Sequence, residues 1–168
     1  SHKYYLRLYL ANASNLPLTY TIESHPISVD WNVGTGRLAD SPIVTDGVSW
    51  EYSHESGSGI WFNPLSFPAG QTGSYQNGSN NIGGGLWWTG SQYKSTQTFS
   101  QATVKDIELE VTNTVERWNS NYLDNYGFIV KHSDSIEFTS ASKFETKYFS
   151  GNTHTIYPPC LEIRWDDS

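Results

Sequence analysis

Two pairs of carboxylates are the first residues in this sequence that could do chemistry. Glu51 with Glu55, and Glu108 with Glu110, are candidates for the two carboxyl groups that glycoside hydrolysis requires. Glu108 and Glu110 share one face of a predicted strand, and the apolar residues that alternate with them occupy the other face. Solvated surface charge explains this pattern without an active site.

Motifs for other reactions are missing from the sequence. No G-x-S-x-G segment marks a nucleophilic serine. The glycines at 83–85 are not followed by the Lys and Ser or Thr of a phosphate-binding loop. We therefore expect that the chain is not an enzyme.

Residues that could bind a metal are scattered along the chain. None of the histidines lies in an H-x-H, H-E-x-x-H or Cys/His cluster, the spacings typical of transition-metal sites. The histidines are His2, His25, His54, His132 and His154. The candidates for Ca²⁺ are Asp40, Asp46 and Asp124, which lie in predicted loops without a calcium-loop signature. We expect these three aspartates to be solvated surface residues and the chain to bind no cofactor. The alternative is that they bind Ca²⁺.

Aromatic side chains are the residues through which the chain could bind sugar, because an indole face can stack on the apolar face of a pyranose. Trp87 and Trp88 are adjacent, so in a strand they point to opposite faces and one of them can be exposed. The glycines at 83–85 place the pair near a loop, where binding residues concentrate. With Tyr93 they form the predicted glycan platform. The interpretation favoured over this platform is that one indole is core and the other packs under a loop or against a partner chain.

The composition predicts the fold that must position these residues. Aromatic residues make up 15% of the 168 residues, and 14 Gly and 7 Pro interrupt the chain at short intervals. Aromatic residues suit strands, and frequent turn residues suit many short ones. We expect an all-β chain: one domain over residues 1–168, an antiparallel β-sandwich of the jelly-roll type.

Alternation of apolar and polar residues locates the strands. Residues 4–10 alternate strictly, and after a turn at 12–17 a second strand at 18–23 is expected to pair with the first. Further predicted strands cover 48–52, 59–62, 86–89, 95–99, 107–111, 128–131, 136–139, 143–149 and 161–165. Between them, Asn113 with Glu116 three residues later resembles a capping box and predicts one short helix at 113–120. Val111, Val115 and Trp118 would share its apolar face.

Four tryptophans are predicted to be mostly buried and to anchor the core. Trp31 and Trp50 recur between glycines at about the spacing of one strand and one loop, as segments that return to a common core would. Trp118 lies on the apolar face of the predicted helix, and Trp165 lies on the apolar face of the last predicted strand.

The charge balance excludes two kinds of partner. Ten Lys and Arg against 17 Asp and Glu leave a net charge of −7, which opposes binding to nucleic acid or to an anionic membrane. No apolar segment is long enough for membrane insertion. Cys160 is the only cysteine, so no intrachain disulfide can form.

Six short motifs occur in an order that resembles a known family. They are Leu6-Arg7-Leu8-Tyr9, Pro26-Ile27-Ser28, Trp31-Asn32-Val33-Gly34-Thr35-Gly36, Gly47-Val48-Ser49-Trp50, Gly127-Phe128-Ile129-Val130-Lys131 and Pro159-Cys160-Leu161-Glu162-Ile163. Nearly end to end, this order resembles the DNRLRE-type β-sandwich module. The resemblance implies a non-catalytic jelly roll of bacterial surface and secreted proteins, some of which bind polysaccharide such as alginate. Family members have further strands before the segment that matches residues 4–10, so it also implies that N-terminal strands of the full module are missing here.

The end of the chain narrows this resemblance. Residues 147–159 and 165–168, together with Leu10-Ala11-Asn12-Ala13, look like the version of the module in virion structural proteins of large marine tailed phages, notably cyanophages. This implies a structural or adhesion module of a virion, located in the tail, neck or baseplate or decorating the particle. Its partners would be other virion subunits or host-surface polysaccharide. The alternative is a carbohydrate-binding module of a secreted polysaccharide-degrading enzyme, located outside the cell or on the bacterial surface.

Overall fold

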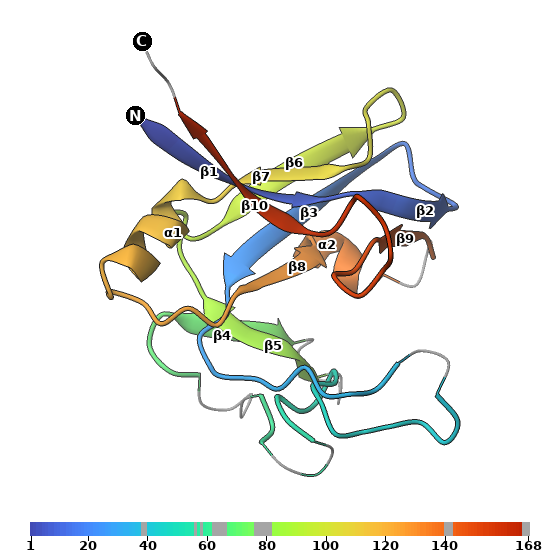
Figure 1. Ribbon diagram of the computed structural model, residues 1–168, viewed down its shortest axis with the longest axis vertical. Helices are drawn as coiled ribbons and strands as arrows, with labels where there is room; N and C mark the ends of the chain where they lie inside the picture. The colour runs from blue at the N-terminus through green and yellow to red at the C-terminus, as the bar shows by residue number, and fades with distance from the viewer. Residues whose placement is uncertain are drawn as a thin grey trace. The chain divides into compact units, whose positions relative to one another are not determined.

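In the computed structural model, the alternating residues at the start of the chain form strand β1 (His2–Leu8). It lies between β10 (Cys160–Trp165) and β7 (Ile107–Glu110), antiparallel to both (Figure 1). Polar residues of the three strands share one face of the sheet, while Leu6 is paired with Leu161 and Leu109 on the other. The predicted two-residue period is therefore confirmed here.

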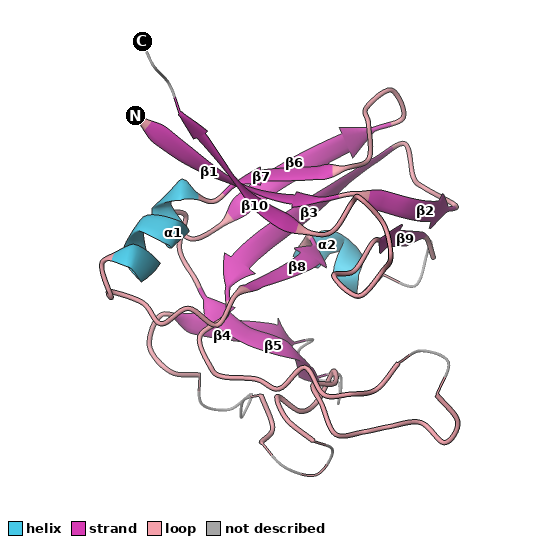
Figure 2. Cartoon of the chain, viewed as in Figure 1, coloured by secondary structure: helices cyan, strands magenta, loops and turns pink. Residues whose placement is uncertain are grey.

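The structure describes residues 1–37, 40–55, 57, 59–61, 67–75, 82–139 and 143–165. They fall into two units. Unit 1 comprises Ser1–Ser24, Gln92–Ser120 and Val130–Ser168, and unit 2 comprises His25–Ser91 and Asn121–Ile129. Antiparallel strands predominate, so the predicted all-β, sandwich-like class is confirmed (Figure 2). Whether the chain acts as one domain stays a prediction.

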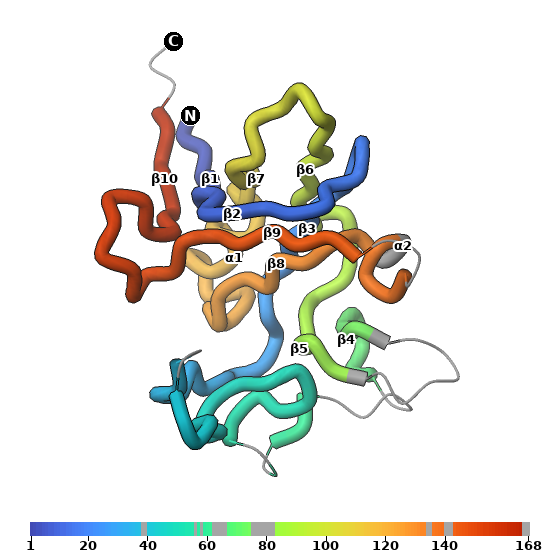
Figure 3. The backbone as a smooth tube through the Cα atoms, turned by 90° about the vertical axis from the view of Figure 1, so that its right-hand side faces the viewer, coloured from blue at the N-terminus to red at the C-terminus, as the bar shows by residue number. Residues whose placement is uncertain are grey.

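The predicted pairing of the first two strands is wrong. β1 leads through Tyr9 into β2 (Leu10–Ser14), which pairs with β9 (Glu145–Tyr148), as Figure 3 shows. The next strand, β3 (Thr19–Pro26), lies between β6 (Ser95–Ser100) and β8 (Phe128–His132). The connection from β2 to β3 has no two-residue hairpin turn that would hold the two strands together. Residues 22–27 are buried throughout, so β3 occupies a central position that the alternation did not indicate.

Side chains join the β10–β1–β7 sheet to the β6–β3–β8 sheet along the boundary between β7 and β6. Gln97 donates from Nε2 to the carbonyl of Asp106 and accepts the backbone N–H of Glu108 at Oε1, over 3.1 and 2.7 Å. The hydroxyl of Ser95 donates to the carbonyl of Glu110. These bonds satisfy backbone groups that a neighbouring strand would otherwise pair.

Behind these sheets lies the core of unit 1. Phe99, Ile107 and Leu109 are essentially inaccessible to solvent, and Tyr20 stacks on Phe99 with ring centroids 4.9 Å apart. Helix α1 (Thr112–Asn119) directs Val115 toward the interior, and Val111 immediately before it is buried as well. The helix is therefore confirmed close to its predicted position.

Two details of the helical segments differ from the sequence prediction. The residue that caps α1 is Val111, which makes no side-chain capping bond, so the capping box at Asn113 is wrong. The adjacent Thr112 hydroxyl instead accepts the backbone N–H of Tyr4. The predicted strand at 136–139 is also wrong, because Ile136 and Glu137 bond back to the carbonyl of Ser133 and form the helical turn α2 (Asp134–Glu137).

Unit 2 contains one strand pair and long loops. β4 (Gln71–Tyr75) pairs with β5 (Ile82–Trp88), and Ile27 adds an isolated bridge to Trp87. β4 was not predicted. The strands β5 to β10 lie close to predicted strands. The predicted strands at 48–52 and 59–62 reduce to one bridge, Tyr52 to Ile60, and Phe62 lies outside the described residues.

The core of unit 2 is built around Ile27, Trp61 and Leu86. Partly buried hydrophobic residues pack against it: Val29, Trp31, Phe67, Tyr126 and Ile129. In the described part of the chain, no helix has the length and apolar character needed to cross a membrane.

Candidate functional site

The predicted glycan platform is largely buried. Trp87 is only 3% exposed and lies with its ring centroid 5.8 Å from that of His25, within unit 2. Tyr93 is buried in unit 1, with the guanidinium of Arg117 5.3 Å from its ring centroid. The two adjacent indoles do differ in burial, since Trp88 is half-buried near Gly70. Trp87 and Tyr93 are therefore wrong as an exposed platform, because their faces already pack against protein.

The predicted tryptophan core is also wrong at two of its four positions. Trp50 is 48% exposed and Trp165 is 69% exposed, while Trp31 and Trp118 are half-buried. Trp165 is exposed because it ends a strand at a sheet edge. In the stretch from Trp31 to Trp61, the buried indole is that of Trp61, which is 7% exposed.

Hydrogen bonds hold two indoles of unit 2 in place. Trp61 donates from Nε1 to the carbonyl of Ser49 over 2.9 Å. Trp31 donates from Nε1 to the carbonyl of Tyr126 over 2.8 Å. Both indoles therefore act as structural ties for the loops, as a buried Trp N–H with a partner usually does.

Trp50 lies across the glycines of β5. The backbone N–H of Gly84 donates to the Trp50 carbonyl over 2.7 Å. A Cβ at Gly83 would lie 2.0 Å from that carbonyl oxygen, and a Cβ at Gly84 would lie 2.7 Å from Cζ3 of the ring. Only glycine leaves room for the indole here, and Gly84 also has a φ of +72°. The ring is thus held on one side by glycine backbone while much of its surface remains open to solvent.

Two loop segments that precede Trp50 in the sequence cross in close contact with each other. A Cβ at Gly34 would lie 2.6 Å from the Cα of Gly47, so the backbones touch. Val48 donates its N–H to the carbonyl of Asn32 over 2.7 Å. The Asp46 carboxylate accepts both the N–H and the hydroxyl of Thr35, the latter over 2.7 Å. The Thr35 hydroxyl bond, followed by its backbone bond, lowers the pKa of Asp46 below its ordinary value.

The crossing loops enclose an open hollow of about 350 Å³. Its lining combines exposed apolar residues with the charged residues Asp46 and Arg37. The lining residues are Val33, Gly36, Arg37, Ile43, Val44, Thr45, Asp46, Gly47, Val48 and Ser49. We call this hollow together with the Trp50 side chain the loop face. Exposed aliphatic side chains in such number are typical of surfaces that contact a partner.

The calcium candidates do not converge in the structure. Asp46 uses its carboxylate on Thr35, and Asp40 accepts the N–H of Arg37 over 2.7 Å. Asp124 is exposed. Within the described residues, no three His, Cys, Asp or Glu side chains gather in a way that could hold a metal ion. Calcium binding stays a prediction without a built site.

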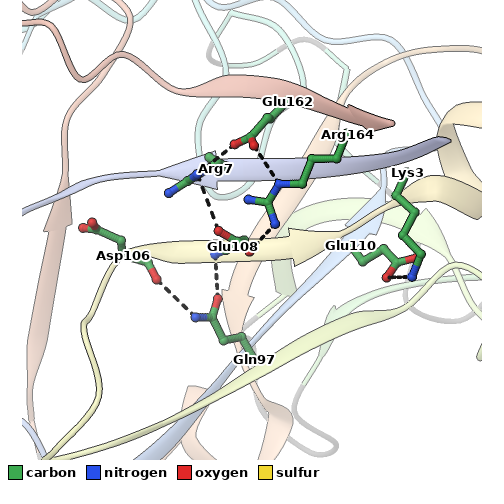
Figure 4. A network of polar contacts seen from close by, with 8 residues as sticks. All are labelled: Lys3, Arg7, Gln97, Asp106, Glu108, Glu110, Glu162 and Arg164. Carbon is green, nitrogen blue, oxygen red and sulfur yellow. Dashed lines mark hydrogen bonds and ion pairs between the residues drawn. The ribbon is translucent and has the colours of Figure 1, made fainter. Parts of the chain in front are cut away.

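The carboxylates at 108 and 110 belong to a charge ladder on the outer face of β10, β1 and β7 (Figure 4). Glu108 accepts from Arg164 over 2.9 Å, and Arg7 donates to Glu162 over 2.7 Å. Lys3 pairs with Glu110 over 3.0 Å. We call these six residues the charge ladder.

The arginines of the charge ladder stabilise Glu108 and Glu162 in the ionised form. The Arg164 guanidinium lowers the pKa of Glu108 by hydrogen bonding to it. Hydrogen bonds from Arg164 and then Arg7 lower the pKa of Glu162 to about 2. A general acid of a glycosidase needs a raised pKa, so the shifts have the opposite sign. Glu51 and Glu55 are exposed in unit 2.

A buried charge cluster in unit 1 was missed by the sequence analysis. Glu23 on β3 contacts Lys131 over 3.2 Å and also Lys94, and Lys131 contacts Glu137 over 3.0 Å. The side chains of Glu23 and Lys131 are 2% and 5% exposed. Alternation placed Glu23 on a polar and hence solvated face, but the central position of β3 buries both faces. The only local signal was the position of Lys131 within an apolar strand.

Comparisons of the chain with protein-family models, with curated proteins and with solved structures give no match.

Proposed function

We propose that this chain is a non-catalytic binding module that contacts its partner through the loop face of unit 2. The observation that carries the proposal is the indole of Trp50, which rests on Gly83 and Gly84 and is 48% exposed. A rigidly held, open indole can stack on a sugar ring or fill a pocket of a partner protein at little cost in side-chain entropy. The hollow, lined by residues up to Ser49, adds exposed aliphatic side chains from the same stretch of loops.

The absence of acid–base character in the charge ladder supports a non-catalytic role. The pKa values of Glu108 and Glu162 are lowered, and arginines hold both carboxylates in a fixed network. The resemblance to the DNRLRE-type module supplies the setting: a virion of a tailed phage, in the tail, neck or baseplate or on the particle surface. There the loop face would contact other virion subunits or host-surface polysaccharide.

Binding to polysaccharide tests the loop face. Affinity gel electrophoresis against alginate and other surface polysaccharides should show retardation of the wild type, and Trp50→Ala should weaken it at least about tenfold, as loss of a binding anchor does. Trp165→Ala is the matched control, because it removes another exposed indole from unit 1. Equal loss in both variants, or none in Trp50→Ala, would contradict the assignment of the site.

Proteomics of purified virions tests the setting. The chain should be found in particles in a stoichiometric amount, and its absence would refute the virion role. An exposed Trp50 equally suits the alternative, a carbohydrate-binding module of a secreted polysaccharide-degrading enzyme. The genes that flank the coding sequence distinguish the two, since one predicts a phage structural operon and the other a polysaccharide-use locus. Turnover of algal polysaccharide that is lost in Glu51→Gln or Glu108→Gln would instead reveal an enzyme.

A further inference from the structure

β10 lies at the edge of its sheet with an exposed apolar strip. In the described part of the chain it pairs on one side only, with β1 (Figure 1). Leu161, Ile163 and Trp165 share the face that carries Leu6 and Leu109, yet they are 44%, 41% and 69% exposed. The apolar face of the sheet therefore continues past the region that the rest of unit 1 covers.

The backbone of the same three residues faces away from the sheet. Val111 donates its N–H to the carbonyl of Tyr4, so the backbone groups of Tyr4 point toward β7. In an antiparallel sheet these directions alternate along a strand, so those of Tyr5 point toward its partner Glu162 on β10. The N–H and C=O groups of Leu161, Ile163 and Trp165 consequently point outward. An edge of this kind is a template for another strand.

We propose that this edge pairs with β10 of a second copy of the chain, antiparallel and about a two-fold axis at Ile163. In this register Ile163 of one copy lies opposite Ile163 of the other, and Leu161 lies opposite Trp165 of the second copy. Glu162 lies opposite Arg164 of the second copy, so unlike charges meet on both sides of the axis. The two charge ladders become continuous on one face, and the apolar strips become continuous on the other.

The sequence of β10 selects this register over its neighbours. An axis at Glu162 or at Arg164 would place like charges directly opposite each other, which is destabilising. An axis between residues would place Glu162 or Arg164 opposite an apolar residue and join the apolar face of one copy to the charged face of the other. Only the axis at Ile163 satisfies the charge and apolar patterns together. The paired edge belongs to unit 1 and is independent of the proposed function of unit 2.

The chain also limits how far the pairing extends. Pro158 and Pro159 precede β10 and have no N–H to donate, so the ladder begins at Cys160. A contact made by one strand of six residues is small. We expect a dimer that dissociates on dilution below roughly 100 µM, since such interfaces lie below the size of a stable complex.

Sedimentation velocity of the whole chain tests the proposal. Measured under reducing conditions, which exclude a disulfide between exposed Cys160 residues, the wild type should shift from monomer to dimer between about 10 µM and 1 mM. Ile163→Pro removes the central outward N–H but no bond to β1, and it should abolish the dimer while far-UV circular dichroism is unchanged. A wild type that remains monomeric, or a folded Ile163→Pro that still dimerises, overturns the proposal.

A charge exchange tests the register even if Ile163→Pro fails to fold. Glu162→Arg alone places Arg opposite Arg, and Arg164→Glu alone places Glu opposite Glu, so each variant should be monomeric. Mixing the two variants restores two unlike pairs and should produce a one-to-one heterodimer, visible by native mass spectrometry. Dimers of either variant alone, or no heterodimer in the mixture, overturn the register.

Discussion

The ammonium of Lys131 lies 3.2 Å from Oε1 of Glu23, and both side chains are almost fully buried. The same ammonium lies 3.0 Å from Oε2 of Glu137, which is itself mostly buried. Burying one charge without its partner costs far more than the pair contributes. The two strands β3 and β8 are thus joined by an interaction whose value depends on both partners being present.

Replacing Lys131 by Met should destabilise unit 1 strongly, because Glu23 and Glu137 then lose a shared buried cation. We expect a loss of about 3–5 kcal/mol in the free energy of unfolding. Urea unfolding measures it. The double variant Lys131→Met with Glu23→Leu should recover part of the loss. Lys3→Met is the control, since it removes the exposed pair with Glu110 and should leave the urea midpoint nearly unchanged. Equal effects at positions 131 and 3 would contradict the burial of the cluster.

The stability of the protein should fall in acid partly because of Glu162. Its pKa is lowered from 4.5 to about 2 in the folded state, so the folded form binds its proton less readily than the unfolded form does. The contribution of Glu162 is complete above pH 4.5 and is lost as the pH falls toward 2. Urea midpoints of the wild type and of Glu162→Gln should therefore converge over this range. Parallel urea midpoints of the two proteins over this range would contradict the role of Glu162.

Adding a methyl group at Gly84 should displace Trp50. The new Cβ would lie 2.7 Å from Cζ3 of the indole and would also strain a backbone with φ +72°. Gly84→Ala should cost about 1–3 kcal/mol, as overpacking does. In the background of Trp50→Ala the cost should shrink, because the ring is gone. Gly151→Ala, where a Cβ would have nothing within 4 Å, is the control and should be neutral. Equal costs with and without the indole would show that only backbone strain matters.

The start of α1 should depend on Thr112 and not on Asn113. Thr112→Val removes the acceptor for the Tyr4 N–H, and loss of one hydrogen bond should cost about 1 kcal/mol. Asn113→Ala should leave the stability nearly unchanged, because Asn113 is exposed and does not cap the helix. Thermal unfolding of the two variants gives the comparison. A larger loss of stability in Asn113→Ala than in Thr112→Val would show that Asn113 caps the helix.

Local periodicity was sufficient to locate most elements. β1, β7 and β10 were visible in the sequence because a two-residue period directly reflects which side of a strand each side chain occupies. α1 was visible because Val111, Val115 and Trp118 recur at a helical spacing. These features depend on neighbours in the chain, so the amino-acid order alone determines them.

The tertiary structure decided which surfaces those elements share. It placed β3 between β6 and β8, and this buried Glu23 although alternation assigned it to solvent. It also exchanged the expected roles of Trp50 and Trp87, since the glycines of β5 leave Trp50 on their surface while Trp87 packs inward. Strand partners and burial arise from contacts between residues far apart in the sequence. No local pattern encodes them, and for this reason the candidate site could be recognised only in the folded chain.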